Sequence, residues 1–417
     1  MIEWSESHQM IRDAIRKFVE AEIKPRIEEL EHGDTPPYEV LRKMIRTFGM
    51  DEMARQRFRH QIEKDKADEA ARASGRMPER EERKARADGG DSAALQIIPI
   101  IELCRFCPGL VTAMGVSMGL TAASIMSKGT IAQKEKWALS LLTLEKVGAW
   151  AITEPGSGSD AFGGMKSSAR REGDEYVLNG NKTFITNGPY ADTIVFICKL
   201  DEPGVESRSR KILHFVLDRG MPGLTQSKPM RKMGLHSSPT GELFLQDVRA
   251  GGDRLLGGNE ERAAKAGRAG TKDTFSMERS GVAAMALGII ERCLELSVDY
   301  ARTRVQFGKP IGEFQLIQDK LARMEVARMN VQNMVFRQIE LVASGKSMTF
   351  AEASAMKLYS ARAATEVAME AVQLFGGNGY MAEYQVEQLA RDAKAMQIYA
   401  GTDEIQISQI ARSLLSN

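Results

Sequence analysis

Cysteine is scarce in this chain, with four residues among 417, and aromatic residues make up only 6%. Only Cys104 and Cys107 lie close together, as Cys-Arg-Phe-Cys. No second cysteine pair and no nearby histidines accompany them, so this spacing is weak support for zinc or redox chemistry. The pattern favours reduced thiols inside a helix of a cytoplasmic protein, and we predict no metal site.

A surplus of charge of either sign is also missing. The 57 basic and 56 acidic side chains leave a formal net charge of +1. This balance excludes a global field that would recruit nucleic acid or an anionic membrane. No apolar run approaches the ~20 residues of a membrane span, and the first residues lack the basic and apolar segments of a secretion signal. We therefore expect no nucleic-acid partner, no membrane span and a cytoplasmic location.

The length of the chain exceeds what a single hydrophobic core usually holds, which predicts two or three domains. In residues 1–150, apolar side chains recur at helical spacing, as at Ile11, Ile15 and Phe18. Ser5 can cap the first helix, and Pro25 should end or kink it. We predict an N-terminal α-helical domain over residues 1–150.

Within this domain, residues 51–91 differ from their surroundings. They are rich in arginine, lysine, glutamate and aspartate, and they contain few large apolar residues. The segment is typical of a solvated excursion, partly helical with ion pairs four residues apart, or mobile. The alternative interpretation is a lid or a subunit contact. Residues 51–91 are thus predicted to be a charged insertion.

Residues 151–252 contain short β-branched runs separated by turn signals. The clearest turn signals are residues 179–181 (Asn-Gly-Asn) and 187–189 (Asn-Gly-Pro), each after an apolar run. Asn-Gly between apolar runs is a strong hairpin signal. We predict an all-β domain here, a small barrel or sandwich.

Helical periodicity returns after residue 273 and continues to the end of the chain. Residues 253–272 are interpreted as a connector, and long periodic segments cover 275–302, 313–343, 350–375 and 383–398. Their lengths and short connections predict an antiparallel four-helix bundle over residues 253–417. The predicted fold class is α+β, with a helical domain, a β domain and a C-terminal helical bundle in that order.

Two segments of the predicted β domain suit a phosphate-bearing ligand. Residues 151–160 read AITEPGSGSD, where glycine and serine after a proline let backbone N–H groups approach an anion closely. Residues 179–188 read NGNKTFITNG about two strands later. Either segment alone is a common kind of turn, but the two in this order are much more specific.

Further motifs lie in the predicted bundle, namely RTRVQFGKPI at 302–311 with FQ at 314–315, QLFGGNGY at 373–380, RDAK at 391–394 and QIYAGTDEIQ at 397–406. In order and spacing, these motifs and the two β segments resemble the acyl-CoA dehydrogenase family. The resemblance covers residues 1–50 loosely and 92–417 closely, and it leaves 51–91 as an insertion.

The resemblance implies FAD bound between the β domain and the bundle, in an enzyme that converts an acyl-CoA thioester to a trans-2-enoyl-CoA. It also implies an electron-transfer flavoprotein as partner and a homotetramer in which a neighbouring subunit reaches part of each FAD. Positions matching flavin contacts are Ile152, Thr153, Gly158, Ser159, Phe184, Thr186, Arg304, Gln306, Gln315, Gln373, Gly376, Gly377, Thr402 and Glu404. Positions matching substrate contacts are Ser159, Ser276, Arg279, Gly401 and Arg412.

Two of these positions carry specific expectations. Phe184 matches an aromatic residue that covers one face of the flavin, and Thr186 matches a threonine near its reactive nitrogen. Taken in isolation, Phe184 would more often be a core aromatic, Arg304 a surface ion pair and Gln315 a residue at a helix start.

The base is the unusual feature of the chain. Many members of the family carry a catalytic glutamate directly before the Gly-Thr of the last motif, where this chain has Ala400, whose methyl group cannot accept a proton. Relatives such as isovaleryl-CoA and long-chain dehydrogenases carry it on an early helix of the C-terminal domain, and Glu278 matches that position.

The helical neighbours of Glu278 at i+3, i+4, i+7 and i+8 are small or apolar. Burial on such a stripe should raise its pKa and strengthen it as a base. In the alternative interpretation, Glu278 lies in an early helical turn and complements the helix dipole. Separately, the alternative to a substrate contact at Arg279 is an ion pair between Arg279 and Glu278.

Three functions remain open at this point. The first is an FAD-dependent acyl-CoA dehydrogenase with Glu278 as its base. The second keeps the fold but lets oxygen reoxidise the flavin, as in acyl-CoA oxidases or flavin monooxygenases. The third is a non-catalytic flavin-binding or interaction protein that has lost its base. Neither the length nor the branching of the acyl chain can be predicted.

Overall fold

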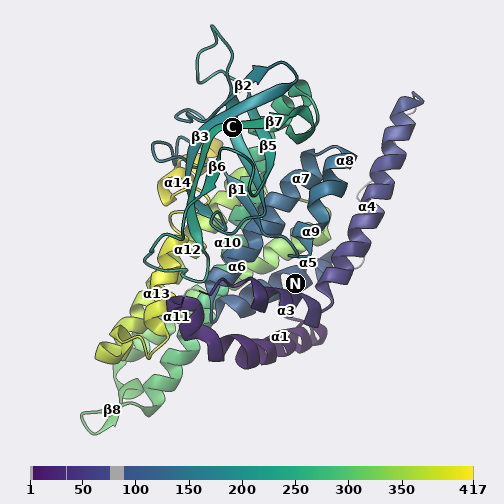
Figure 1. Cartoon of the computed structure of the whole chain (residues 1–417). Coiled ribbons are helices and arrows are strands. Elements are labelled where there is room, and N and C mark those ends of the chain that lie inside the picture. The colour runs from purple at the N-terminus through teal and green to yellow at the C-terminus, as the bar shows by residue number, and fades with distance from the viewer. Residues whose placement is uncertain (1–2, 34, 76–88, 417) are drawn as a thin grey trace.

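The computed structural model describes residues 3–33, 35–75 and 89–416, without the side chains of residues 89–92, 265–266 and 268–277. The elements described before residue 143 are all helices, a sheet follows, and long helices complete the chain (Figure 1). The predicted fold class is confirmed.

The first helix begins as the sequence predicts. Helix α1 (Glu6–Phe18) is capped by the Ser5 side chain, which accepts from the backbone N–H of His8. Pro25 falls in a short 3-10 turn between α1 and α2, where its missing N–H breaks no helical hydrogen bond. The remaining N-terminal elements are η1 (Val19–Ile23), η2 (Lys24–Arg26), α2 (Ile27–His32), α3 (Tyr38–Thr47), α4 (Met50–Ala73), α5 (Gly89–Cys104), α6 (Pro108–Met114), η3 (Gly115–Ala122), α7 (Ala123–Lys128), α8 (Ile131–Gln133), η4 (Lys134–Ala138) and α9 (Leu139–Leu142).

The charged insertion contains the long helix α4, which stands at the edge of the molecule (Figure 1). Phe58 and Ile62 bury their side chains in a cluster with Trp137. Ion pairs join Lys66 to Glu135 at 2.8 Å and Lys134 to Asp65 at 2.7 Å. The predicted helical character is confirmed for α4, and both ion pairs reach the neighbouring element η4 rather than the next turn of α4. The insertion's residues 76–88 lie outside the described part of the chain.

One segment departs from the prediction that no apolar run is long enough to span a membrane. Pro108–Lys128 is long and apolar enough to span a membrane by length and composition. The prediction missed this segment because glycine, serine and threonine interrupt its apolar residues. Its most apolar window is 61% buried inside the molecule. Mostly buried core helices pass the same test, so the segment is weak evidence for a membrane.

The middle of the chain forms one curled sheet of seven strands. Its order is β1-β4-β2-β3-β7-β6, with β5 also paired to β4. Strand β4 is buried along its whole length, because its two faces contribute to two different apolar cores. The strands are β1 (Gly148–Ala151), β2 (Ser168–Glu172), β3 (Glu175–Thr186), β4 (Thr193–Leu200), β5 (Ile212–Asp218), β6 (Leu224–Gln226) and β7 (Thr240–Gly251).

The hairpin predicted at residues 179–181 is wrong. Strand β3 runs through this segment without a turn and shifts its register with β7 between Leu178 and Gly180. A Cβ at Gly180 would lie 2.2 Å from the Ser167 hydroxyl oxygen, so glycine permits close packing there. The Asn-Gly signal marks an irregularity inside a strand.

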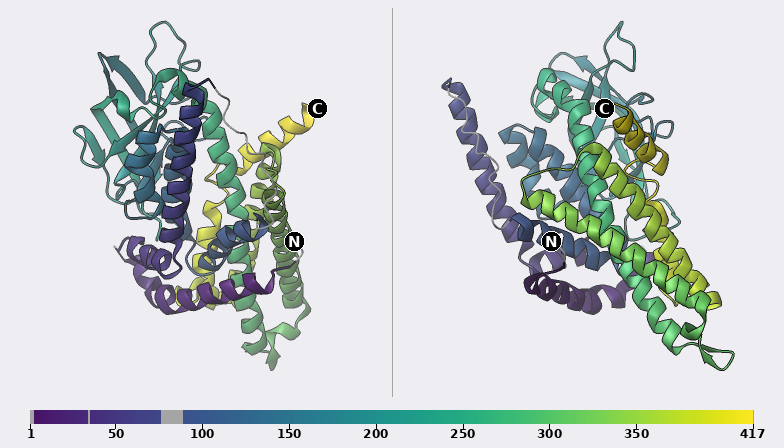
Figure 2. Two further views of the ribbon diagram at one scale, coloured as in Figure 1. Left: turned by 90° about the vertical axis from the view of Figure 1, so that its right-hand side faces the viewer. Right: turned by 180° about the vertical axis from the view of Figure 1, so that it is seen from behind.

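The C-terminal helices are longer than predicted. Helix α10 (Glu260–Thr303) starts well inside the predicted connector, and the Asn259 side chain caps it by accepting from the Arg262 N–H at 3.0 Å. The other long helices lie alongside it (Figure 2). The remaining elements are η5 (Gly252–Arg254), β8 (Val305–Gln306), β9 (Lys309–Pro310), η6 (Ile311–Glu313), α11 (Gln315–Ala343), α12 (Phe350–Phe375), η7 (Gly376–Tyr380), α13 (Val386–Ala395) and α14 (Asp403–Leu415).

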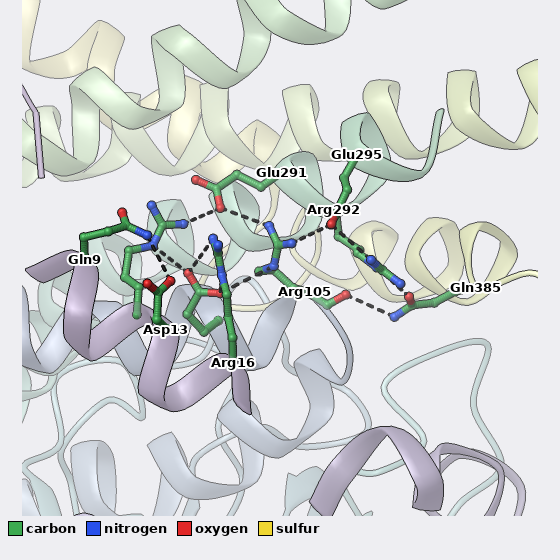
Figure 3. Close-up of polar contacts among 10 residues, drawn as sticks. Gln9, Asp13, Arg16, Arg105, Glu291, Arg292, Glu295 and Gln385 are labelled. Carbon is green, nitrogen blue, oxygen red and sulfur yellow. Dashed lines mark hydrogen bonds and ion pairs between the residues drawn. The ribbon is translucent and has the colours of Figure 1, made fainter. Parts of the chain in front are cut away.

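An ionic network joins α1, α5 and α10 (Figure 3). Arg12 pairs with Glu102 and with Glu291, each at 2.6 Å, and Arg16 pairs with Glu102 at 2.7 Å. Arg105 pairs with Glu291 at 3.3 Å. Most of these side chains are buried, so each charge depends on its partners to offset lost hydration. The network fastens the first helix of the chain to the middle of α10.

Candidate active site

The turn between α13 and α14 has an unusual backbone. Ala400 has φ +55° and Gly401 has φ +90°. Left-handed φ is uncommon for a residue with a Cβ, so the surroundings must hold Ala400 in place. Thr402 then caps α14, its side chain accepting from the Ile405 N–H at 3.4 Å.

Three side chains hold the two carbonyl groups of this turn. The Ala400 carbonyl accepts from Arg279 Nε at 3.1 Å and from Gln406 Nε2 at 3.0 Å. The Gly401 carbonyl accepts from Lys357 Nζ at 2.9 Å and from Gln406 Nε2 at 2.7 Å. Two of the donors are cations, and charge-assisted hydrogen bonds are the stronger kind. The turn is therefore fixed from its protein side by α10, α12 and α14.

Glu278 and Arg279 are neighbours on α10, next to this turn. The Arg279 guanidinium is buried, donates to the Ser354 hydroxyl at 3.0 Å and lies 4.2 Å from the ring centre of Phe350. Among the described residues, no hydrogen bond or ion pair joins it to Glu278. Arg279 holds the turn, so the alternative of a paired Glu278 is not supported.

The Glu278 carboxyl group is half-buried, and no described residue forms a hydrogen bond with it. Burial raises its pKa to about 7, and the positive charges of Arg279 and Lys357 oppose that rise. A group with a pKa near neutrality suits general base catalysis. The predicted upward shift of the pKa is confirmed.

The alternative role of Glu278 at the helix dipole is wrong. Helix α10 begins at Glu260, so Glu278 lies several turns inside it. The dipole effect is confined to about the first turn. The sequence placed the helix start too late, because residues 253–272 contain glycines and few apolar side chains.

The predicted flavin positions of the sheet lie at the ends of β1 and β3. Ile152 is buried, Thr153 and Thr186 are half-buried, and the backbone around Gly158 and Ser159 is exposed. Phe184 is 66% exposed and has φ +57°, so the alternative of a core aromatic is wrong. A Cβ on Gly158 would meet nothing within 4 Å, which leaves room for a ligand against this loop. These features fit a flat ring system carrying a pyrophosphate.

A buried ion pair holds the loop that contains Gly158 and Ser159. Lys182 Nζ lies 2.8 Å from the Glu154 carboxylate, which also accepts from the N–H groups of Lys166 and Ser167. Burial acts to raise the pKa of Glu154, but Lys182 and these hydrogen bonds hold it below its ordinary value. The two predicted ligand-binding segments contain one of these residues each, but the sequence gave no sign that the two residues pair.

The other predicted flavin positions are remote from Glu278. Arg304 follows the end of α10, about 39 Å along the helix from Glu278 at ~1.5 Å per residue. All of this group are exposed, and all lie near the same end of the long helices: Arg304, Gln306, Gln315, Gln373, Gly376 and Gly377. A single chain therefore does not bring the two groups of flavin positions together.

The remaining predicted positions are scattered. Glu404 is exposed in the first turn of α14, and Arg412 is exposed near its end. Ser276 lies in α10, but its side chain is outside the described part of the chain. Cys104 and Cys107 are buried, and Cys107 Sγ lies 3.0 Å from the Ser237 hydroxyl. In the described ranges, no three histidine, cysteine or acidic residues cluster as a metal site.

The sequence reading missed Lys357, Ser354 and Gln406, which surround the turn or its partner Arg279. A lysine among the small and apolar residues of α12 was a signal that could have been used, because buried lysines are rare. Gln406 offered no signal, because glutamine is common on helix surfaces.

Comparison with known proteins agrees with this architecture. Residues 5–54, 149–248 and 265–415 match the family models for the N-terminal, middle and C-terminal domains of acyl-CoA dehydrogenase. The chain is 39% identical over 328 residues to a short-chain-specific acyl-CoA dehydrogenase of Megasphaera elsdenii, covering 79% of this chain and 83% of that one. It is 34% identical to a 3-(aryl)acrylate reductase of Clostridium sporogenes, covering 99% of each chain.

Solved structures give the same result. An acyl-CoA dehydrogenase from Geobacillus kaustophilus superimposes with a TM-score of 0.83 at 34% identity, covering 99% of this chain and 98% of that one. A Mycobacterium smegmatis glutaryl-CoA dehydrogenase in complex with FADH2 superimposes with a TM-score of 0.79 at 25% identity, covering 99% of this chain and 96% of that one. The resemblance inferred from the motifs is confirmed.

Proposed function

Since the chain belongs to the acyl-CoA dehydrogenase family, we propose that Glu278 removes the α-proton of an acyl-CoA thioester. The members of the family are flavin-dependent oxidoreductases that act on acyl-CoA, and this chain is an enzyme of that class. The observation that supports Glu278 is its half-buried carboxyl group, unpaired among the described residues and with a pKa near neutrality. Ala400, at the other candidate position, has only a methyl group.

FAD is the proposed cofactor. Bound FAD would accept the hydride that leaves the β-carbon. Residues that would hold its ring lie at Thr153, Phe184 and Thr186, and the exposed backbone at Gly158 and Ser159 would face its pyrophosphate. Glu278 takes the proton as a carboxylate, so the base is competent once the pH passes its pKa of about 7.

The test is anaerobic bleaching of the flavin by a panel of acyl-CoA thioesters. We expect Glu278→Gln to retain its yellow flavin and to lose bleaching. Asp299→Asn changes an exposed acid on the same helix and should bleach like the parent. Rapid bleaching of the Glu278→Gln protein would remove Glu278 from this role. Readmitting air then separates a dehydrogenase, which reoxidises slowly, from an oxidase.

A second candidate direction is reduction of a 2-enoate or 2-enoyl thioester. It is favoured by the similarity to the 3-(aryl)acrylate reductase over 99% of both chains. Protonated Glu278 would then deliver its proton to the α-carbon. Reoxidation of chemically reduced enzyme by cinnamate or cinnamoyl-CoA, but not by a saturated thioester, would support this direction.

A homotetramer is the proposed assembly. The two separated groups of flavin positions need a second subunit to form one complete site. Helices α11 and α12 also border a groove of about 720 Å³, and the exposed side chains of Val326 and Tyr359 line it. Light scattering of the purified protein tests this assembly. An electron-transfer flavoprotein is the proposed electron acceptor, and the cytoplasm is the proposed location.

A further inference from the structure

We propose that Lys357 is a positioning residue, which holds the Gly401 carbonyl and thereby keeps the N–H groups of Gly401 and Thr402 turned toward a bound ligand. This inference rests on the proposed function, because it concerns the same site. The ligand atom would be an electron-rich oxygen, either the thioester carbonyl or an oxygen of the FAD pyrophosphate.

The position of Lys357 is costly for a lysine. Its side chain has no exposed surface, and it lies in α12 between the buried residues Met356 and Ser360. Its partners are the Gly401 carbonyl at 2.9 Å and Asp403 Oδ1 at 3.8 Å. A buried ammonium group loses its hydration and is rare without a close carboxylate. Burial lowers the pKa of Lys357 to about 8, against the opposing charge of Asp403.

The orientation of the turn follows from its carbonyl groups. No peptide bond in the described ranges is cis, so each C=O of this turn points opposite the N–H of the following residue. The Ala400 and Gly401 carbonyls point to Arg279, Lys357 and Gln406. The N–H groups of Gly401 and Thr402 must therefore point to the other side. Neither donates to any residue in the described part of the chain, so both are available to a ligand.

Lys357 is the one of these three donors that acts only on Gly401. Arg279 binds the Ala400 carbonyl, and Gln406 is shared between the two carbonyls. Without Lys357, the Gly401 carbonyl keeps a single neutral donor. Glycine at positive φ has other conformations available to it, so the Gly401–Thr402 peptide is free to rotate.

Lys357 also acts on the base through its charge. The charged or titratable groups that influence the Glu278 carboxyl group are Arg279 beside it on α10, Lys357 on α12 and Tyr399 at the turn. The two cations favour the carboxylate form. Removing Lys357 therefore raises the pKa of Glu278 and moves proton removal to higher pH.

The experiment uses Lys357→Met, with Arg362→Met as the matched control. Arg362 lies on the same helix, carries the same charge and pairs with Asp403 at 2.9 Å, but it does not contact the turn carbonyls. One arm measures the affinity of the apoprotein for FAD. The other titrates the holoprotein with acetoacetyl-CoA, which is an equilibrium probe because its β-carbon carries no hydrogen. Its bound enolate gives a long-wavelength band with the flavin.

We expect Lys357→Met to lower the affinity for FAD or for acetoacetyl-CoA by about tenfold, the loss typical of one charge-assisted hydrogen bond. The pH midpoint of the enolate band should rise in the same variant. Arg362→Met should change each affinity by less than about threefold, because the Arg362 side chain is 53% exposed and solvent screens its charge. A loss confined to acetoacetyl-CoA assigns the N–H groups to the thioester carbonyl. A loss confined to FAD assigns them to the pyrophosphate.

Parent-like affinities for both ligands in Lys357→Met would overturn the proposal. If that variant does not fold, as judged by circular dichroism, Lys357→Gln is measured instead, and the same outcomes apply. Failure of the proposed function gives a different result. The parent protein would then neither bleach with any acyl-CoA nor form the enolate band, while the FAD arm would still test Lys357.

Discussion

Two groups of acidic side chains lie on helix α10 with different degrees of burial, and they are built in opposite ways. Glu291 and Glu295 belong to the ionic network, where Arg12, Arg105 and Arg292 surround them (Figure 3). Desolvation acts to raise the pKa of Glu295, but Arg105, Arg292 and Arg16 hold it below its ordinary value. Glu278 lies earlier on the same helix, has no partner among the described residues and has a raised pKa.

The difference shows what an acid on this helix needs in order to stabilise the fold or to act as a base. A carboxylate that accepts several charged hydrogen bonds cannot easily take a proton, so it serves to fasten helices together. An acid kept close to cations, but not bonded to them, retains its proton affinity. Arg279 is such a cation, because its guanidinium contacts the Ala400 carbonyl, Ser354 and Phe350 instead of bonding to Glu278.

The largest expected effect is on the rate of flavin bleaching when the unpaired acid, Glu278, is replaced. Replacing Glu278 by glutamine should slow flavin bleaching by about 10³- to 10⁴-fold, toward the upper range for removal of a general base. Stopped-flow absorbance of the anaerobic enzyme measures the rate. A loss below tenfold would mean that another group removes the proton.

Removing a paired acid of the ionic network should lower the stability of the fold. Glu102→Ala leaves Arg12 and Arg16 without their shared partner, and we expect the free energy of unfolding to fall by about 3–5 kcal/mol. Denaturant titration measures this change. The pH dependence of bleaching should remain that of the parent, because the network lies several helical turns from Glu278. A stability equal to the parent's would show that the network does not fasten α1.

Glu278→Gln should also stabilise the protein at neutral pH, in contrast to Glu102→Ala. The folded protein holds the pKa of Glu278 at about 7, above the ~4.3 of an unfolded chain. The free energy of unfolding of the parent therefore falls as the pH rises between these two pKa values. Above pH 7 it remains lower than it is at pH 4. We expect the variant to gain about 1–3 kcal/mol at pH 8 and almost nothing near pH 4. Melting curves across this range measure the difference, and a gain independent of pH would contradict the assignment.

The smallest effect is expected at the exposed start of α10. Arg171 and Glu260 form a salt bridge at the surface, next to Tyr176. Exposed pairs contribute little, so Arg171→Ala should change the free energy of unfolding by no more than about 1 kcal/mol. Thermal unfolding at low and high salt measures it. A loss like that of Glu102→Ala would remove the distinction between buried and exposed pairs.

Much of the fold could be predicted from local signals. Helical spacing at Ile11, Ile15 and Phe18 located α1, and β-branched runs located the sheet. The errors fell where a local signal has two meanings. Asn-Gly marks hairpins and also strand irregularities, and in β3 the packing of Ser167 against Gly180 decided between them. Polar, glycine-containing residues at 260–272 read as a connector, yet they form the start of α10.

The candidate active site was also predictable only in part from the sequence. The sequence by itself determined the family, the missing acid at Ala400 and the candidate acid at Glu278, because these depend on residue identity within motifs. Only the tertiary structure decided that Glu278 is unpaired among the described residues and that Lys357 and Gln406 hold the turn. Arg279 and Ala400 are 121 residues apart, and their contact is set by how α10, α12 and α14 pack together. Local periodicity reports which face of a helix is apolar, but not which remote carbonyl a buried cation will reach.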